Sequence, residues 1–283
     1  FFKNLNSIAI SAGLFGLFSY SNPVKSETPA LCKDVLTQTT TQKNIFSQNT
    51  GEARTALASS DYYCLGSPDK FELTIYEMGL CTQTPISGSP KAFSKVNCVT
   101  TMASAGTTAD LAGKTVTLPP ATGRPANATY THAYIVILNT FGLRGSISLD
   151  GTVYCSTNTG EVDDSANCVA SNHVEELDDF GDGPGGDPWE ADFGPETMPT
   201  GGKVSAILTD SDLVRADDNE DVSRLIGVFE TNAGSPVVIN DSVNGVEVEL
   251  QVSDGGYGIA FNGSSGVPVD FGSAPFKPVF NTF

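Results

Sequence analysis

Short segments in which apolar and polar residues alternate follow one another from Lys70 to the end of the chain, and this pattern constrains the fold most. In residues 245–254, GVEVELQVSD, every second side chain from Val246 to Val252 is apolar, as expected of a half-buried strand with one solvent-exposed face. Turn residues separate about a dozen such segments, which predicts a mainly β fold, an antiparallel β-sandwich or jelly roll. The predicted strands are 70–79, 95–102, 114–118, 132–138, 146–149, 152–155, 202–208, 224–231, 235–240, 246–253, 256–261, 267–271 and 274–283.

Two stretches carry more specific signals. Residues 133–138 are apolar without interruption, which predicts a central strand covered on both faces. The dipeptide Asp150-Gly151 separates two strand patterns and favours a two-residue β-hairpin turn. No strong helical periodicity follows residue 60, so we expect a head built from strands and turns.

Six cysteines, an even number, favour three disulfides and an exported, extracellular or cell-surface protein. Six cysteines allow fifteen connectivities, and we favour pairing of neighbours because each pair brackets a loop-like stretch rich in turn residues. The predicted bonds are Cys32 with Cys64, Cys81 with Cys98, and Cys155 with Cys168. The chain has no CxxC pair and only two histidines, so we do not expect a zinc site.

Negative charge dominates the chain, with a formal net charge of −18, and it is concentrated between residues 161 and 221. That interval holds 18 Asp or Glu residues against Lys203 and Arg215. An acidic surface repels phosphate backbones and anionic membranes, so nucleic acid is not an expected partner. The simplest role of this charge is solubility.

Residues 175–202 are rich in Gly, Pro and Asp, and we predict a long acidic surface loop there. This loop is either simply solvated or a calcium site, because its aspartates offer hard oxygen ligands at close spacing, although not the EF-hand spacing. The candidate ligands are Asp178, Asp179, Asp182, Asp187 and Asp192. No other cofactor is expected. Trp189 would either anchor this loop or stack on a sugar.

Residues suited to catalysis are scarce, and we do not expect an enzyme. His132 opens the predicted buried strand and His173 lies in a loop pattern, so neither belongs to a recognisable nucleophilic triad. The chain has no GxSxG, HExxH or phosphate-cradling glycine motif. Paired carboxylates for glycoside hydrolysis could not be recognised by motif among 33 acidic residues.

Both ends of the chain are apolar. Residues 5–20 follow Lys3 and precede Pro23, and they would form either the core of a secretory signal peptide or a retained hydrophobic segment, which is a helix of about 16 residues or an extended stretch. Such a helix is shorter than the ~20 residues of a membrane span. At the other end Phe276, Phe280 and Phe283 predict either the final strand of the chain's own sheet or a strand exchanged between subunits.

Phe1, a run of mostly apolar residues and Pro23 precede a cysteine-containing β pattern. In this order of features the opening segment resembles the N-terminus of a type IV pilin. The resemblance implies that the segment is retained and that its helices bundle in a filament core, although Leu5 stands where that family has its glutamate. From Lys70 onward the chain resembles uncharacterised secreted β-sandwich proteins of marine bacteria.

We therefore expect three parts: an N-terminal assembly segment or signal peptide (1–30), a partly helical linker (31–69) and the β head (70–283). The predicted function is that of a structural subunit of a pilus-like extracellular bacterial filament, polymerising through the N-terminal segment, donor-strand exchange, or both. The expected assembly residues are Phe1, Leu5, Ile8, Ile10, Leu14, Phe15, Leu17, Phe18, Phe276, Phe280 and Phe283. The alternative is a secreted calcium- or carbohydrate-binding module with an uncleaved signal peptide. Expected partners are other copies of the chain, with a cell surface or its glycans as further candidates and a membrane only before assembly.

Overall fold

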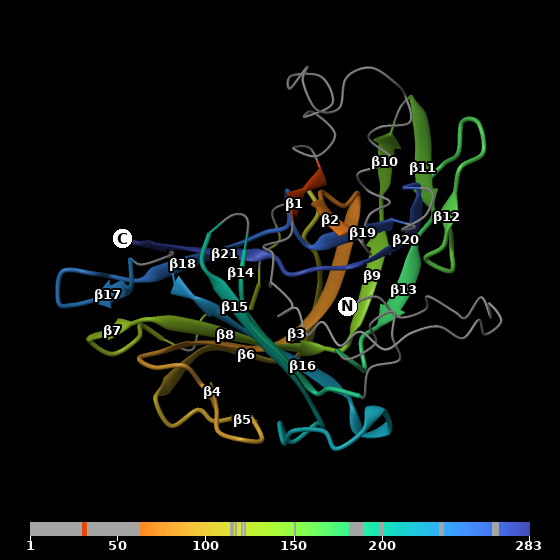
Figure 1. The fold of residues 1–283 in the computed structure, drawn as a ribbon. Helices are drawn as coiled ribbons and strands as arrows, with labels where there is room; N and C mark the ends of the chain where they lie inside the picture. The colour runs from red at the N-terminus through yellow and green to blue at the C-terminus, as the bar shows by residue number, and fades with distance from the viewer. Residues whose placement is uncertain are drawn as a thin grey trace, which may run out of the picture.

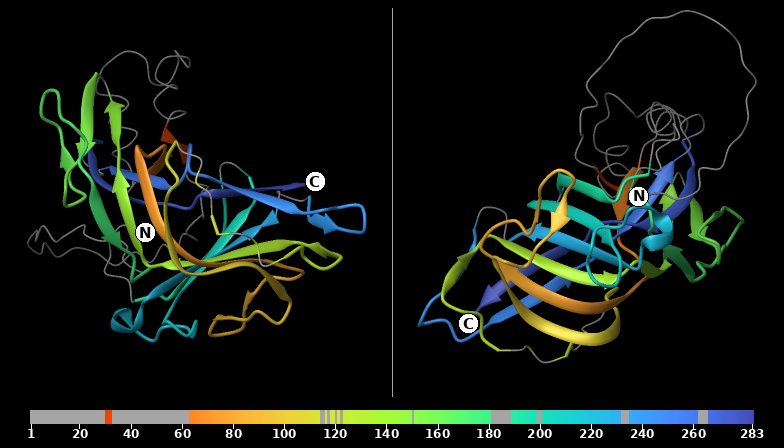
Figure 2. Two further views of the ribbon diagram at one scale, coloured as in Figure 1. Left: turned by 180° about the vertical axis from the view of Figure 1, so that it is seen from behind. Right: turned by 90° about the horizontal axis from the view of Figure 1, so that it is seen from below.

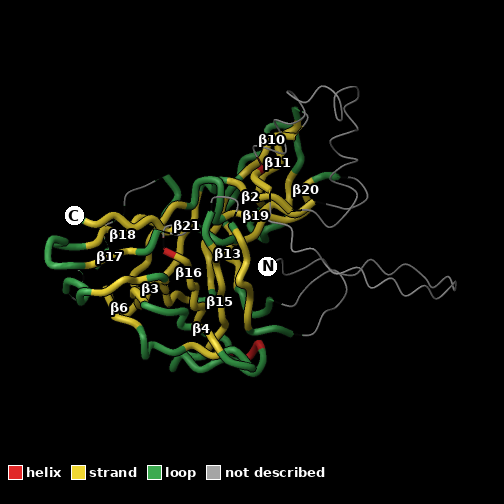
Figure 3. The backbone as a smooth tube through the Cα atoms, turned by 60° about the vertical axis from the view of Figure 1, so that its left-hand side comes forward, coloured by secondary structure: helices red, strands yellow, loops and turns green. Residues whose placement is uncertain are grey.

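The structure, a computed structural model, describes residues 30–32, 63–113, 116, 118, 119, 121, 123–149, 151–180, 189–198, 201–231, 235–261 and 266–283. Most of its regular elements are strands, joined by loops (Figures 1 and 3). They are β1 (Ala30–Leu31), β2 (Tyr63–Gly66), β3 (Lys70–Cys81), β4 (Ile86–Ser87), β5 (Ala92–Phe93), β6 (Cys98–Asp110), β7 (Ala128–Tyr130), β8 (His132–Leu138), β9 (Thr140–Arg144), β10 (Ser146–Leu149), β11 (Thr152–Ser156), β12 (Val162–Asp163), β13 (His173–Glu176), β14 (Asp192–Thr197), β15 (Lys203–Thr209), the 3₁₀ turn η1 (Asn219–Asp221), β16 (Arg224–Glu230), β17 (Val237–Ile239), β18 (Val246–Gln251), β19 (Tyr257–Phe261), β20 (Pro268–Ser273) and β21 (Lys277–Thr282). The prediction of a mainly β chain with antiparallel sheets is confirmed.

The largest sheet has eight strands in the order β13-β9-β3-β8-β16-β15-β14, with β6 on the free side of β3. The consecutive strands β8 and β9 both pair with β3, since Ile137 of β8 lies opposite Ile75 and Leu143 of β9 lies opposite Phe71. Beyond them the sheet divides, because β16 pairs with β8 whereas β13 pairs with β9. The sheet therefore curls into a half-barrel (Figures 1 and 2).

Smaller sheets, the β18-β21 ribbon and the four strands β1-β2-β19-β20, pack across one face of the half-barrel. The ring of Phe71 in β3 lies 5.8 Å from that of Phe141 and 5.9 Å from that of Phe276, between centroids. Tyr257 of β19 stacks on Phe271 of β20 at 5.4 Å. These rings are almost completely buried, so one hydrophobic core joins the half-barrel to the smaller sheets.

The opposite face of β8 is covered as well. The β4-β5 hairpin packs there, and Phe93 makes an edge-to-face contact with Tyr134 of β8 at 5.4 Å. All residues of β8 from Ala133 to Ile137 are buried. The prediction of a central strand covered on both faces is confirmed.

The hairpin predicted at Asp150-Gly151 is present, because Leu149 of β10 pairs with Thr152 of β11 and two residues separate the strands. Gly151 has a φ of +80°, a left-handed conformation that glycine adopts without steric cost. The two-residue connection between β10 and β11 is therefore the one that the sequence pattern predicts.

The three disulfides join the predicted neighbours and confirm that pairing. Their Cα–Cα distances are 4.9 Å for Cys32–Cys64, 4.0 Å for Cys81–Cys98 and 6.0 Å for Cys155–Cys168. Disulfides of this number persist in oxidising compartments, so the chain belongs to an oxidising environment.

The β structure begins earlier in the chain than the pattern from Lys70 predicts. β2 pairs with β19, with Cys64 opposite Ile259, and β1 runs parallel to β2. β2 falls in the predicted linker, and β1 lies across the boundary between the predicted N-terminal segment and this linker. Residues 33–62 of the linker lie outside the described residues. Residues 1–29, with the predicted assembly residues from Phe1 to Phe18, also lie outside them. In the described part of the chain, no helix is long and apolar enough to span a membrane.

The acidic loop predicted at 175–202 contains a strand, which corrects that prediction. β14 pairs with β15, and a bulge lies between Phe193 and Glu196. Among the described residues β14 is the last strand of the sheet, and no strand there pairs with its outer edge. A bulged edge strand tolerates Pro195, which has no amide hydrogen for the ladder. The Gly and Pro residues that predicted a loop therefore fit an edge strand.

Candidate functional site

A groove of about 370 Å³ opens between the half-barrel and the β18-β21 ribbon, next to the C-terminus. Its floor is one face of β3 and β6, where Met78, Leu80 and Met102 are buried. Met78 and Met102 are direct partners in the β3-β6 ladder, so their side chains share that face. The volume lies within the range of about 300–1,000 Å³ that is typical of binding pockets. We call it the β3–β18 groove.

β18, the turn before it, residues between 118 and 125, Thr101 and Phe283 complete the lining. β18 contributes the half-buried Val246 and Val248, while its intervening Glu247 and Glu249 are exposed on the other face. The alternating pattern of the sequence therefore directs the valines into the groove. The remaining lining residues are Thr101, Leu118, Pro119, Ala121, Gly123, Arg124, Pro125, Asn244, Gly245 and Phe283.

Arg124 ties one side of the groove to the turn before β18. Its Nε donates to the carbonyl of Val243 at 2.7 Å, and its Nη2 donates to Asn127 Oδ1 at 2.7 Å and to the carbonyl of Asn240. Asn127 Nδ2 in turn donates to Asp241 Oδ1 at 2.6 Å. Because a guanidinium holds several acceptors in a fixed geometry, this cluster gives the groove its shape before any partner binds.

The groove is almost free of charge. Among the described residues of its lining, Arg124 is the single charged side chain, although the chain carries a net charge of −18. The arginine is already occupied by the carbonyl and amide acceptors around it. A mainly apolar groove whose arginine is already hydrogen-bonded, on an acidic protein, is suited to an uncharged apolar partner.

An open strand edge borders the groove. β18 pairs with β21 in unbroken register from Val246 opposite Thr282 to Gln251 opposite Lys277, and no other strand of the described residues pairs with it. The neighbouring edge strand β6 is less regular, because its register with β3 shifts twice. An unpaired edge presents N–H and C=O groups that can bind a further strand. β18 is therefore the regular edge beside the groove.

The C-terminal phenylalanines divide between the core and the surface. Phe276 and Phe280 are 5% and 6% exposed, and the ring of Phe276 packs 5.4 Å from that of Phe229. Phe283 is 68% exposed and lines the groove. Because β21 pairs with β18 of the same chain, this placement favours the final strand of the chain's own sheet over an exchanged C-terminal strand.

The aspartates predicted to bind calcium are held by other partners where the structure describes them. Asp192 lies 2.7 Å from Lys91 Nζ and 3.4 Å from Arg215 Nη2. Burial raises the pKa of Asp192, but these two cations outweigh burial and hold the pKa below its usual value. Asp179 accepts a hydrogen bond from the backbone of Glu190 at 2.9 Å.

No group of three His, Cys, Asp or Glu residues suited to a metal ion occurs in the described part of the chain. Asp178 is buried, while Asp182 and Asp187 lie outside the described residues. The calcium site therefore stays a prediction, one in which Asp192 already has cationic partners.

Trp189 has the contacts of an anchor. Its indole Nε1 donates to the carbonyl of Asp178 at 2.8 Å, and Arg215 lies over its ring at 5.9 Å from the centroid. The ring also packs against the main hydrophobic core. Of the two roles predicted for Trp189, these contacts favour anchoring.

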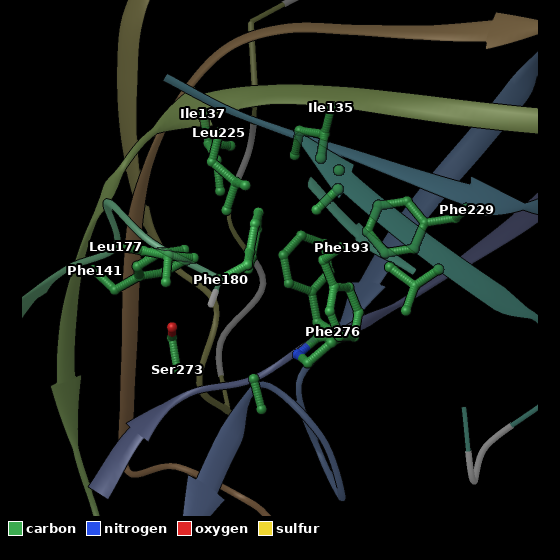
Figure 4. Close-up of a pocket in the computed structure, with 15 residues that line it drawn as sticks. Ile135, Ile137, Phe141, Leu177, Phe180, Phe193, Leu225, Phe229, Ser273 and Phe276 are labelled. Carbon is green, nitrogen blue, oxygen red and sulfur yellow. The ribbon is translucent and has the colours of Figure 1, made fainter. Parts of the chain in front are cut away.

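A second hollow, an apolar cavity of about 50 Å³, lies inside the half-barrel (Figure 4). Ile135 and Phe229 face it from β8 and β16, and Phe276 closes it from the link before β21. The cavity is far smaller than the ~150 Å³ in which an apolar void holds a benzene molecule. It is therefore a packing gap and not a ligand site.

A cluster of acidic groups lies where β13 meets β20. Glu175 accepts a hydrogen bond from the backbone N–H of Ser273, and Glu161 forms a single β-bridge with Asp270. Burial first, and then the neighbouring Glu175 and Glu161, raise the pKa of Asp270 to about 7. Burial likewise raises the pKa of Glu175.

His173 lies beside this acidic cluster. Its Nε2 bonds the carbonyl of Phe271 at 3.1 Å, and burial lowers the pKa of the imidazole. A neutral imidazole donating to a backbone carbonyl has a structural part in joining β13 to β20. The contact fixes the edge of the half-barrel against the smaller sheet.

The sequence analysis missed the groove because its lining comes from segments far apart in the chain. Two signals were present: residues 98–109 contain no charged residue and no proline, and residues 246–252 alternate. Neither signal reveals that β6 and β18 face each other. No family model, curated protein or solved structure matches the chain, so its function has to be inferred from the groove and the strand edge.

Proposed function

We propose that the chain is the structural subunit of an extracellular bacterial filament, a homopolymer whose copies join at the β3–β18 groove. The observation that carries this proposal is the mainly apolar groove beside the open edge of β18, on a chain of net charge −18. Leaving apolar surface in water costs a free energy of roughly 25 cal/mol per Å². An apolar recess on an acidic protein is therefore suited to binding a partner that covers it.

The three disulfides support secretion and a durable subunit. Cys32–Cys64 ties β1 to β2, Cys81–Cys98 ties β3 to β6, and Cys155–Cys168 closes the region after β11. Each cross-link limits the unfolded chain, and native disulfides typically contribute about 2–5 kcal/mol. A subunit outside the cell benefits from this stability because it cannot be refolded there.

The apolar N-terminal segment supports polymerisation from the sequence side. Residues 4–24 contain no charged residue, which sets them apart from the acidic head. Helix bundling of the pilin kind and strand donation would both use this segment. Either mode requires residues 1–26 in the mature protein.

The first test is the intact mass and N-terminal sequence of the protein recovered from the cell exterior, with electron microscopy of the same sample. We expect filaments whose subunit retains residues 1–26. A variant lacking these residues should stay monomeric in sedimentation while the head keeps its unfolding transition.

A retained segment in a protein that stays monomeric at high concentration would contradict the proposal. Removal of the segment together with measurable binding of Ca²⁺ or glycans would replace it with the secreted binding module.

A further inference from the structure

We infer that residues 7–14 of a second copy bind the β3–β18 groove as a β-strand paired with the outer edge of β18. The inference rests on the proposed function and identifies the donor segment and the acceptor surface. It differs from bundling of N-terminal helices, which would leave the groove empty.

The donor segment has the periodicity of a half-buried strand. Residues 7–14 are Ser-Ile-Ala-Ile-Ser-Ala-Gly-Leu, with Ile8, Ile10 and Leu14 at alternate positions together with an alanine at 12. The intervening residues are serine, alanine, serine and glycine. In a strand, all the larger side chains share one face. In a helix, Ile8 and Ile10 would point about 200° apart, so this short stretch fits a strand better.

The acceptor surface matches that apolar face. A strand added beside β18 continues the β21-β18 layer and lies across the floor formed by Met78, Leu80 and Met102. Val246 and Val248 already point from β18 into the groove. The donor residues Ile8 and Ile10 would extend this row, because side chains at alternate positions of neighbouring strands lie on one face.

The charges of the two partners are compatible. Glu247 and Glu249 are exposed on the outer face of β18. The donor would place its serines, alanine and glycine beside them, so no like charges meet across the strands. An acidic segment of the chain would meet repulsion at this edge.

Donation between copies produces an open chain. Each subunit contributes the donor segment to one neighbour and the β3–β18 groove to another, and the two surfaces differ. Such a head-to-tail contact repeats without limit unless its rotation closes a ring. The inferred contact therefore has the geometry that a filament needs.

Face-specific cross-linking tests the inference. All six native cysteines are in disulfides, so introduced cysteines are the free thiols. We would mix two isotopically distinct full-length variants, one with a donor cysteine and one with an acceptor cysteine, oxidise them, and identify cross-linked peptides by mass spectrometry. The donor variants are Ile8→Cys, Ile10→Cys and Ala9→Cys, and the acceptor variants are Val248→Cys and Glu249→Cys.

The expected result is a pattern and not a single product. Ile8→Cys or Ile10→Cys should link between chains to Val248→Cys, and Ala9→Cys should link to Glu249→Cys. Pairs from opposite faces, such as Ile10→Cys with Glu249→Cys, should give at least tenfold less product. Equal cross-linking of all pairs, or linking only within one chain, would overturn the inference.

A charge in the groove provides a second readout. Val248→Lys should weaken polymerisation at least tenfold in sedimentation, whereas Glu249→Lys on the outer face should not, provided both heads keep the parent unfolding transition. Filaments that form normally with Val248→Lys and give no face-specific cross-links would overturn strand donation and the groove as the contact site, while the filament role itself would stand and rest on bundling of the N-terminal segments. A parent chain that retains residues 1–26 and forms no filaments would contradict both the inferred strand donation and the proposed filament function.

Discussion

Asp270 shows how the tertiary structure changes the chemistry of one residue. Its carboxyl group is partly buried in β20 and lies near Glu175 and Glu161, which raises its pKa to about 7. In the unfolded chain the carboxyl titrates near 3.8. Folding therefore favours the protonated form, and ionisation above neutral pH opposes folding.

Asp270→Asn should stabilise the protein at alkaline pH. Protonated Asp270 contributes its full stabilisation below about pH 4, and this contribution is lost as pH rises through about 7. The free energy of unfolding of the parent protein should therefore fall across this pH range. The free energy of unfolding of the variant should exceed that of the parent by no more than about 4 kcal/mol at pH 8, and the two values should differ little at pH 4. Urea unfolding at both pH values measures this, with Glu247→Gln on the exposed face of β18 as the control. An equal gain at both pH values would contradict the assignment.

Phe276 is the aromatic residue that joins the C-terminal strand to the core. Phe276→Ala removes ring contacts with Phe71 and Phe229 and enlarges the existing cavity, so it should cost about 3–5 kcal/mol of unfolding free energy. Phe283→Ala, at a 68% exposed position, should cost under about 1 kcal/mol. Denaturant unfolding of both variants separates the two positions, and similar losses would show that Phe276 is not a core residue.

At the scale of elements, β3 depends on a close approach to β8. Gly79 of β3 lies opposite Tyr134, whose ring covers the glycine and whose hydroxyl bonds Glu77 and, at 3.1 Å, Thr100. A methyl group at Gly79 would meet the Tyr134 ring and the carbonyl of Val99. The central strands therefore require a residue without a side chain at this position.

Gly79→Ala should displace the Tyr134 ring and cost about 1–3 kcal/mol, the range for overpacked sites. Gly66→Ala in β2 is the matched control, because its added carbon would lie 3.4 Å from Ile259, an ordinary contact distance. The midpoint of thermal unfolding of the Gly79 variant should lie clearly below that of the control. Equal midpoints would mean that the Tyr134 ring moves aside without loss of stability.

At the scale of the molecule, acidic charge opposes the association that the groove favours. Copies of net charge −18 repel one another over the Debye length, which is about 30 Å at 0.01 M ionic strength and about 8 Å at 0.15 M. Polymerisation should therefore become faster and more complete as salt is raised over this range. Light scattering against ionic strength measures it, and faster assembly at low salt would indicate a contact made by opposite charges instead.

Local patterns account for the parts of the fold in which neighbours in sequence act together. The alternation in β3 and β18, the apolar run of β8, the Asp150-Gly151 turn and the pairing of neighbouring cysteines could all be predicted. Each depends on strand periodicity, on turn conformation or on the turn-rich stretches between neighbouring cysteines. The edge strand β14 was missed because Gly and Pro predict loops unless an edge position and a bulge accommodate them.

The sequence by itself determined the β class, the three disulfides, the acidic charge and the apolar ends of this protein. Only the tertiary structure decided that Phe276 and Phe280 serve the chain's own core, that Asp192 has cationic partners, and that β6 and β18 enclose a groove. The physical reason is that periodicity fixes which face of a strand is apolar. Long-range pairing between distant segments then fixes whether that face is filled from within the chain or left for a partner.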